Sequence, residues 1–245
     1  MDVKLYSIAF SHPSRAAGLM LNHKGIQHER VDLPVGSQQV ALRALGFRHG
    51  TVPALKIDDR RVQGTRKISR ALDETEPAPP LFPADPEKRA AVEEAEHWGD
   101  RTYQPVPRRI FRWAVTSDPD LRALIAQTAG LPAPAVAKHA FWPVSQVYLR
   151  FEGGGRSAAE ADVGALPGHL DHVDELIAKG VIGSPELNAA DFQIGTTTRV
   201  LLNFPQIRPL IEGRPAAEHA MRVAPRFGGE VPVVVPHDWV PSPTR

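Results

Sequence analysis

The sequence predicts a small α/β domain followed by an all-helical domain, with a proline-rich linker between them. Strand-like and helical patterns alternate over the first 75 residues, five prolines crowd residues 76–86, and helical spacing of apolar residues dominates beyond them. The 245 residues, 42% of them hydrophobic, are enough for a substantial buried core. We expect an α/β domain at 1–75, the linker at 76–86, an all-helical domain at 87–224 and a Pro-rich tail at 225–245.

The first elements follow from hydrophobic periodicity and from the residues that interrupt it. Residues 3–8 alternate as a half-buried strand does. Pro13 suits the first turn of a helix, and Gly25 ends that helix as a C′ glycine. Residues 28–33 predict a second strand, and residues 38–46 predict a short stretch that is either helical or irregular.

A hairpin and a helix complete the first domain. Residues 54–57 and 60–63 have strand character and flank an Asp-Asp turn, which predicts a β-hairpin. Thr65 is expected to cap a helix that runs through Leu72. The resulting order is strand, helix, strand, irregular stretch, hairpin, helix, and it predicts a small α/β unit.

The second domain is expected to consist of helices. Two sequences resemble helix-start capping boxes: Ser157 with Glu160, and more loosely Asn188 with Asp191. The tail is expected to be either an ordered segment packed over a domain or a frayed end. The predicted helices span residues 87–102, 120–129, 134–151, 158–179 and 189–203.

Composition excludes several classes of function. No apolar run approaches the ~20 residues needed to span a bilayer, so no membrane partner is expected. The first residues enter a strand pattern with no signal-peptide core, which predicts a cytoplasmic protein. The net charge of +1 argues against a nucleic-acid partner. With no cysteine, the chain cannot form a disulfide, a thiolate metal site or a cysteine nucleophile.

The most informative segment is Gly50-Thr51-Val52-Pro53-Ala54-Leu55. Proline cannot donate a ladder hydrogen bond, so Pro53 fits best where a strand begins. A cis Val52–Pro53 bond would leave the backbone N–H and C=O of Val52 free for a ligand. The simpler alternative is an ordinary trans turn, since only ~5–6% of X–Pro bonds are cis.

Together, these features resemble a cytosolic glutathione transferase over residues 3–203. Ser11-His12-Pro13-Ser14-Arg15 is similar to the family's strand-to-helix turn, where a Ser, Cys or Tyr meets the thiol. The segment from Gly50 to Leu55 is similar to the family's cis-proline loop. Gly64 to Ile68 stands where the family usually has Glu-Ser-x-x-Ile, and Leu187 to Phe192 resembles its buried N-capping box.

The resemblance implies a thioredoxin-like N-terminal domain, an all-α C-terminal domain and the glutathione transferase fold. It implies a homodimer in which the first domain of one subunit lies against the second domain of its mate. The implied function is transfer of glutathione, or of a related low-molecular-weight thiol, to a small electrophile, with no metal. A glutaredoxin-like disulfide exchange is excluded because it requires a cysteine.

Ser11 is the candidate catalytic residue, because aligning Ser14-Arg15 with the family's turn puts Ser11 at the reactive position; Ser14 is the reserve. A free thiol has a pKa of ~8.5 and attacks as the thiolate. A hydroxyl donor contributes ~1.5–3 kcal/mol and helix amides ~0.3–1 kcal/mol, which lowers the thiol pKa by roughly 1–3 units. Alternatively, either serine only caps the helix. His12 is expected to face solvent rather than to act as a second donor.

The candidate residues for holding the thiol compound are Val52, Pro53, Gln63 and Thr65. In the family, the backbone before the cis-proline pairs with the cysteinyl part of glutathione, a role that falls to Val52. The hydroxyl and amide at the next helix start bind the γ-glutamyl carboxylate, which falls to Thr65 unless Thr65 is only a cap. The family's acidic residue before that hydroxyl is Gly64 here. Its loss is expected to weaken binding roughly ten- to a hundredfold, unless Gln63 or a partner subunit substitutes.

Basic residues near these positions favour a more anionic ligand. They are Arg48, His49, Arg66 and Lys67, and Phe47-Arg48 replaces the Asn-Pro that the family has before the glycine of the loop. Another thiol, or no thiol at all, therefore stays an alternative to glutathione.

The second domain supplies candidates for the electrophile pocket, since its early helices face the thiol site in this family. The candidate lining residues are Tyr103, Arg108, Arg109, Arg112 and Trp113. The aromatic residues of this domain are nevertheless expected to be mostly core: Trp98, Tyr103, Trp113, Phe141, Trp142 and Tyr148.

Two further motifs are predicted to carry no chemistry. His169 and His172 share a helix face, but no third ligand is evident, so a solvated face without metal is expected. The glycines at 153–155 follow a helix rather than a strand, which favours a flexible connection over a phosphate loop. Two functions stay open beside thiol transfer: a non-catalytic binding or interaction protein with this fold, and a thiol-dependent isomerase or dehalogenase.

Overall fold

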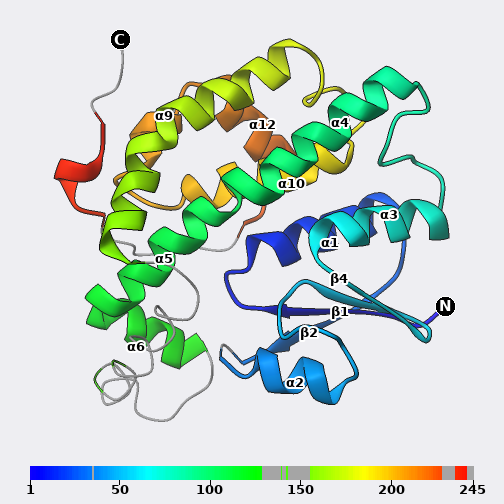
Figure 1. Ribbon diagram of the computed structural model, residues 1–245, viewed down its shortest axis with the longest axis horizontal. Coiled ribbons are helices and arrows are strands. Elements are labelled where there is room, and N and C mark those ends of the chain that lie inside the picture. The colour runs from blue at the N-terminus through cyan, green and yellow to red at the C-terminus, as the bar shows by residue number, and fades with distance from the viewer. Residues whose placement is uncertain (35, 129–138, 140–141, 143–154, 228–234, 242–245) are drawn as a thin grey trace.

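The computed structural model describes residues 1–34, 36–128, 139, 142, 155–227 and 235–241. The first part of the chain forms a four-stranded sheet with helices on both faces, and the rest of the described chain is helical (Figure 1). This confirms the predicted α/β unit followed by helices. None of the described helices is long and apolar enough to cross a membrane.

The sheet has the strand order β2-β1-β3-β4. Strand β1 (Val3–Ile8) runs parallel to β2 (Glu29–Leu33) and antiparallel to β3 (Ala54–Ile57). Strand β4 (Arg60–Gln63) pairs with β3 as the predicted hairpin. The proline-led strand β3 is therefore an interior strand, and its first residues lie beside the last residues of β4.

Helices α1 (His12–His23) and α3 (Thr65–Thr75) cover one face of the sheet, and α2 (Gln38–Ala44) covers the other (Figure 1). Successive side chains on a strand point to opposite faces. Leu5 accordingly joins the large core with α1 and α3, while Tyr6 packs edge-on against Phe47 on the α2 side. Residues 38–46, which the sequence predicts to be either helical or irregular, thus contain helix α2.

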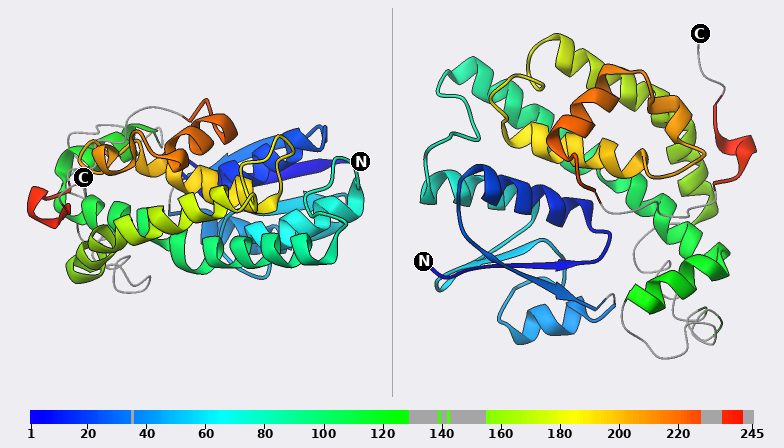
Figure 2. Two further views of the ribbon diagram at one scale, coloured as in Figure 1. Left: turned by 90° about the horizontal axis from the view of Figure 1, so that it is seen from above. Right: turned by 180° about the vertical axis from the view of Figure 1, so that it is seen from behind.

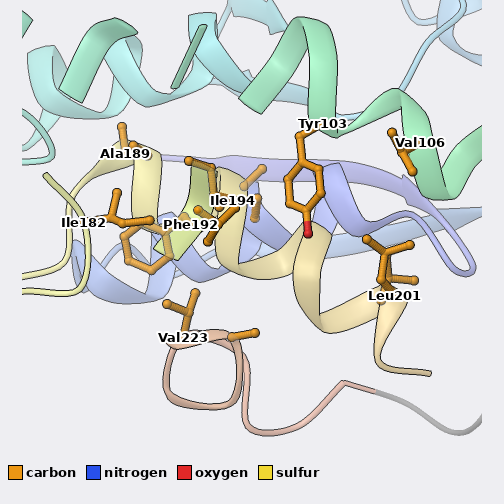
Figure 3. Packing of buried hydrophobic residues seen from close by; sticks show 14 of the residues in the cluster. Tyr103, Val106, Ile182, Ala189, Phe192, Ile194, Leu201 and Val223 are labelled. Atoms are coloured by element: carbon orange, nitrogen blue, oxygen red, sulfur yellow. The ribbon is translucent and has the colours of Figure 1, made fainter. Parts of the chain in front are cut away.

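Helix α10 is the centre of the helical region. It packs against α1, α4 and α12 (Figure 2), and Figure 3 shows its apolar side chains between Tyr103 and Val223. The helical elements are α4 (Pro86–Trp98), the π-helical segment η1 (Gly99–Tyr103), α5 (Pro105–Ser117), α6 (Pro119–Thr128), α9 (Arg156–Ala178), α10 (Ala189–Leu201), α11 (Arg208–Ile211), α12 (Pro215–Val223) and the 3-10 turn η2 (His237–Trp239).

The capping box at the start of α10 is confirmed. The Asn188 side chain accepts from the amides of Ala190 and Asp191, and Asp191 accepts from the Asn188 amide at 2.8 Å. Asp191 also accepts from the Gly183 amide and pairs with His219 Nε2, both at 2.7 Å. All of these groups are buried or nearly so, so the box fastens α10 to the loop before it and to α12.

The predicted capping box of Ser157 and Glu160 is wrong. Helix α9 begins at Arg156 with Gly155 as its N-cap, which puts Ser157 inside the first turn. Helix α5 is absent from the predicted helices, and it carries Pro105 and Pro107 in its first turn. A proline in the first turn of a helix loses no hydrogen bond, since those amides have no intrahelical partner. The predicted helix at 134–151 lies almost entirely outside the described residues.

The described part of the tail is packed on the helices. Trp239 is buried, and its ring lies 4.5 Å from that of Trp113 on α5. The guanidinium groups of Arg15 and Arg199 lie 5.4 and 5.9 Å from the ring of Phe227. These tail residues are therefore ordered and packed over the helices, which is the first of the two alternatives predicted for the tail.

Candidate functional site

The Val52–Pro53 peptide bond is cis, as the resemblance implies. It directly precedes β3, and the carbonyl of Pro53 accepts from the Gly64 amide at 3.0 Å. The antiparallel pairing of Ala54 with Gln63 holds this loop against the end of β4. The structure therefore brings the cis-proline loop next to the start of α3.

Thr65 is the first residue of α3 and is buried, with 2% of its surface exposed. The expectation that Thr65 caps the helix is wrong: the N-cap is Gly64, whose carbonyl accepts from the amides of Lys67 and Ile68. The amides of Thr65 and Arg66 precede these first intrahelical bonds, so they face the open end of the helix. Such amides are suited to bind a carboxylate.

Gly64 departs from the family for a conformational reason. Its φ is +87°, a backbone conformation that residues with a Cβ rarely adopt, and no atom lies within 4 Å of where its Cβ would be. Glycine thus relieves backbone strain at this position and at the same time removes the side chain that carries the family's carboxylate.

Gln63 is fully engaged by the loop before Val52. Its Oε1 accepts from the His49 amide at 2.9 Å, and its Nε2 donates to the carbonyls of His49 (2.6 Å) and Thr51 (3.2 Å). Both protons of the amide are used in this way. Gln63 therefore fastens the loop to β4, and its acceptor, Oε1, already receives the His49 amide instead of standing in for the missing acid.

Ser11 is the N-cap of α1, and Ser14 lies one turn into the helix. Ser11 Oγ accepts from the Ser14 amide at 3.3 Å and lies 2.8 Å from Ser14 Oγ. Ser14 is buried, whereas Ser11 is half-buried. If Ser14 donates within the pair, Ser11 is left with a free proton at the accessible end of the helix.

The turn before Ser11 carries a feature that the sequence did not reveal. Phe10 has a φ of +65°, and its ring lies 5.9 Å from Phe111 on α5. Left-handed backbone in a bulky residue is strained, and such strain occurs disproportionately at functional sites. No sequence signal identifies this conformation, because phenylalanine is not a residue that favours it.

His12 faces the protein interior, so the expectation of a solvent-facing ring is wrong. The ring is 5% exposed, and its Nε2 has no hydrogen-bond partner among the described residues. Burial, reinforced by the charge of Arg108, lowers the pKa of His12 to about 3, although the Gln104 backbone carbonyl acts in the opposite direction. The ring is neutral at physiological pH and sits where α1 meets the start of α5.

The neutral His12 ring predicts a loss of stability in acid. The folded pKa of about 3 lies below the usual 6.5, so between these values the unfolded chain binds a proton that the folded chain excludes. The free energy of unfolding is expected to fall by up to about 1.4 kcal/mol per pH unit below about pH 6.5. Urea unfolding at about pH 7 and about pH 5 should show a smaller difference in His12→Asn than in the parent protein.

The exposed His49 supplies the matched control. His49→Asn is expected to keep the parental pH dependence, because this substitution leaves the buried His12 ring in place. If His12→Asn and the parent lost equal stability between the two pH values, the buried ring would not be neutral.

The candidate pocket residues of the helical region are largely committed to packing. Tyr103 is fully buried, its hydroxyl 3.1 Å from Thr198 Oγ1, and burial raises its pKa. Arg109 forms two 2.5 Å bonds with Asp162, and these raise the pKa of Arg109. Trp113 packs on Trp239. Tyr103, Arg109 and Trp113 thus hold helices together.

The other predicted lining and core residues of this region differ in their exposure. Arg112 is buried and Arg108 is exposed beside His12. Trp142 is 50% exposed, so it is not a core residue. Phe141, Tyr148 and the glycines at 153 and 154 lie outside the described residues.

His169 and His172 do not form a solvated face. Both are half-buried, and their rings lie 6.0 and 4.4 Å from the ring of Trp98. Burial lowers the pKa of His169. Within the described ranges, no group of three or more His, Cys, Asp or Glu side chains is arranged to hold a metal.

The basic residues near the loop divide into two groups. Arg66 points to α4, where it lies 3.4 Å from Glu96 Oε2 and 2.9 Å from His97 Nδ1. Arg48, His49 and Lys67 instead line a hollow beside Gln63. Only the second group is therefore available to a ligand.

Comparison with known proteins bears on the identity of this site. Residues 5–80 match the family described as "Glutathione S-transferase, N-terminal domain". The maleylacetoacetate isomerase of Rattus norvegicus is 38% identical over 92 residues, which are 36% of this chain and 43% of the relative. The match thus covers less than half the length of this curated relative.

Solved structures share the fold over nearly the whole chain. A Tau class glutathione S-transferase from mango, Mangifera indica, has a TM-score of 0.62 at 18% identity and covers 98% of this chain and 93% of its own. The beta-etherase LigF from Sphingobium sp. strain SYK-6 has a TM-score of 0.63 at 21% identity and covers 91% and 99%. At these identities, the likeness concerns the fold.

Proposed function

We propose that the chain is a member of the glutathione S-transferase family, whose N-terminal domain matches residues 5–80, and that it transfers a thiol to a small electrophile. The thiol is glutathione or a related low-molecular-weight compound. The observation that carries the proposal is the cis Val52–Pro53 loop hydrogen-bonded to the start of α3. This arrangement supports a groove that offers backbone groups at one end and helix amides at the other.

Each end of the groove suits one part of the thiol compound. We assign the backbone of Val52, next to Pro53, to the peptide group of the cysteinyl part. The amide and hydroxyl of Thr65 bind the carboxylate at the far end, where the helix dipole favours negative charge. Gln63 serves by holding the loop that carries Val52 in place.

Ser11 acts on the sulfur. In this proposal, the thiol proton leaves to solvent, and the Ser11 hydroxyl donates to the thiolate, whose lone pair then forms a bond to the electrophilic carbon. The leaving group departs with the electron pair of the broken bond. Ser14 supports the reaction by donating to Ser11, which keeps the Ser11 proton directed outward.

A thiol-dependent isomerase is the second candidate, favoured by the 38% identity to a maleylacetoacetate isomerase. In such a reaction the thiol adds to a double bond and is released again, so no thiol is consumed. The two candidates are separated by measuring free thiol during turnover. A non-catalytic binding protein would bind the thiol without turning over either kind of substrate.

We further propose a cytoplasmic homodimer. The family resemblance supports the subunit arrangement, and the reaction draws on glutathione, which the cytosol maintains. Sedimentation of the purified chain tests the oligomeric state.

Titration calorimetry with glutathione tests the proposed function directly. We expect saturable binding, and conjugation of a generic aromatic electrophile. Absence of binding at millimolar glutathione, with no turnover, would overturn it.

Gly64→Glu is expected to strengthen glutathione binding about tenfold, because a charge-assisted contact is restored. It is also expected to lower the free energy of unfolding by roughly 1–3 kcal/mol, because a φ of 87° with a ψ of 141° is a backbone conformation that residues with a Cβ rarely adopt. Calorimetry and urea unfolding measure the two effects. Gly64→Ala is the matched control: it carries the same backbone cost without the carboxylate. If both variants bound glutathione alike, the carboxylate would have no role here.

A further inference from the structure

Phe10 has a backbone conformation that its residue type rarely adopts. The Ser11 amide donates to the carbonyl of Ile8 at 3.3 Å, which closes a four-residue turn with Phe10 in its third position. The φ of Phe10 is +65°, and a turn with a positive φ at this position ordinarily has glycine or asparagine there. The other described non-glycine residue with a positive φ is Asp58 in the hairpin turn, where aspartate is well suited. The turn before Ser11 therefore keeps a bulky ring where the backbone disfavours one.

The ring of Phe10 reaches the helical domain. Its centroid lies 5.9 Å from that of Phe111 on α5, with 36° between the ring planes. Both side chains are half-buried and pack against the large core. Aromatic pairs at this separation attract each other beyond the effect of the area they bury, so the contact offsets the strain of the turn. Glycine at position 10 would relieve the strain but lose the contact.

Ser11 lies between two contacts with α5. On its other side from Phe10, the ring of His12 is buried beside the backbone carbonyl of Gln104, the N-cap of α5. Gln104 and Phe111 are seven residues apart, so they lie on the same face of that helix. The residues before and after Ser11 therefore both pack against one face of α5.

The hydroxyl of Ser11 is fixed by local hydrogen bonds only relative to its own helix. Ser11 Oγ accepts from the Ser14 amide at 3.3 Å and lies 2.8 Å from Ser14 Oγ. Two residues, Ala9 and Phe10, join the end of β1 to Ser11. The conformation of Phe10 therefore sets where the hydroxyl stands relative to the sheet, and so relative to the cis-proline loop before β3.

We propose that Phe10 and Phe111 are positioning residues for Ser11. This inference rests on the proposed function, in which the Ser11 hydroxyl donates to the thiolate. Phe111 belongs to the helical domain, so packing of that domain aims a hydroxyl of the α/β domain at the sulfur. A hydrogen bond weakens steeply when its donor is tilted or displaced. Loss of the ring contact therefore acts on the pKa of the bound thiol and not on the affinity for the thiol compound.

The pKa of bound glutathione, measured by the ultraviolet absorbance of the thiolate, tests the proposal. Phe111→Leu removes the ring but keeps an apolar side chain on α5. It is expected to raise the thiol pKa by about 0.5–1 unit and to lower kcat roughly three- to tenfold. The Kd for glutathione, measured by calorimetry, should stay as in the parent protein. Phe10→Leu is expected to give the same shift, and Phe111→Tyr, which keeps the ring, should restore the parental pKa.

Phe192 supplies the matched control, because it also makes an aromatic contact between α1 and the helical domain. Its ring lies 5.3 Å from that of His23, at the opposite end of α1 from Ser11. Phe192→Leu is expected to lower the free energy of unfolding and to leave the thiol pKa unchanged. A double-mutant cycle isolates the coupling between the two rings. Phe10→Leu/Phe111→Leu should shift the thiol pKa no further than either single variant, because each alone breaks the same contact.

Three outcomes would overturn the proposal in an active parent protein: a parental thiol pKa in Phe111→Leu, equal shifts in Phe111→Leu and Phe192→Leu, or additive shifts in the cycle. If Phe111→Leu weakened glutathione binding at an unchanged thiol pKa, the ring would belong to the binding surface instead. A parent protein that neither binds nor uses glutathione would overturn the proposed function itself, and the positioning role with it. The parent and the variants thus separate the two failures.

Discussion

Replacing Ser11 with alanine is expected to lower kcat/KM for glutathione conjugation roughly ten- to a hundredfold. The pKa of the bound thiol is expected to rise by about 1–2 units, because a hydroxyl donor to a thiolate contributes ~1.5–3 kcal/mol. The pH profile of kcat/KM and the ultraviolet absorbance of the thiolate report this shift. Glutathione affinity, which we propose depends mostly on groups near Val52 and Thr65, should change far less.

Controls separate the donor role of Ser11 from its role as N-cap. Ser11→Thr keeps both the hydroxyl and the cap and should retain most of the activity. Ser11→Asp keeps a good cap but has no proton to donate at neutral pH, so it should be stable and inactive. Ser14→Ala should have the smaller effect on activity. If Ser14→Ala shifted the thiol pKa and Ser11→Ala did not, the roles of the two serines would be reversed.

Asp191→Ala is expected to lower the free energy of unfolding by about 3–5 kcal/mol, because removing a fully buried, multiply bonded carboxylate leaves its partners unsatisfied. Those partners are the amides of Gly183 and Asn188 and the Nε2 of His219, all within 2.8 Å. Denaturant unfolding measures the loss. This loss of stability is expected to be the main effect of the substitution and to exceed any change in the activity that depends on Ser11. The reason is that α10 lies at the centre of the helical region (Figure 3).

Asp85 is the matched control, because it is also an aspartate at a helix start. Its carboxylate accepts from the amides of Glu87 and Lys88, but it is exposed. Asp85→Ala is expected to cost about 1 kcal/mol, the usual value of a solvent-exposed cap. Equal losses in the Asp191 and Asp85 variants would show that burial of the Asp191 network adds nothing.

Much of the fold was predictable because local patterns agreed with tertiary packing. The alternation over residues 3–8, the C′ glycine at 25 and the hairpin at 54–63 all appear as predicted. Helix α5 could not be predicted, because Pro105 and Pro107 look the same in the sequence whether they lie in the first turn of a helix or in a loop. The predicted N-cap at Ser157 is wrong because a capping motif states only a local preference, and the helix has its N-cap two residues earlier, at Gly155.

The resemblance to the family proposed the candidate site residues Ser11, Val52, Pro53, Gln63 and Thr65. Of that proposal, the structure bears directly on the Val52–Pro53 bond, which is cis as expected. The sequence could not reveal that Gln63 is fully hydrogen-bonded, that His12 is buried, or that Arg66 is paired with Glu96 while Lys67 is not. These outcomes depend on which side chains from distant elements meet, and no local spacing encodes that.

The sequence by itself determined the α/β pattern of the first domain, the position of the Val52–Pro53 loop and the loss of the family's acidic residue at Gly64. These are properties of backbone conformation and hydrophobic periodicity, which neighbouring residues control. Only the tertiary structure decided which charges are neutralised and which face an open cavity. Ion pairing and burial join residues that are far apart in the chain, such as Arg70 with Glu96 and His12 with Gln104.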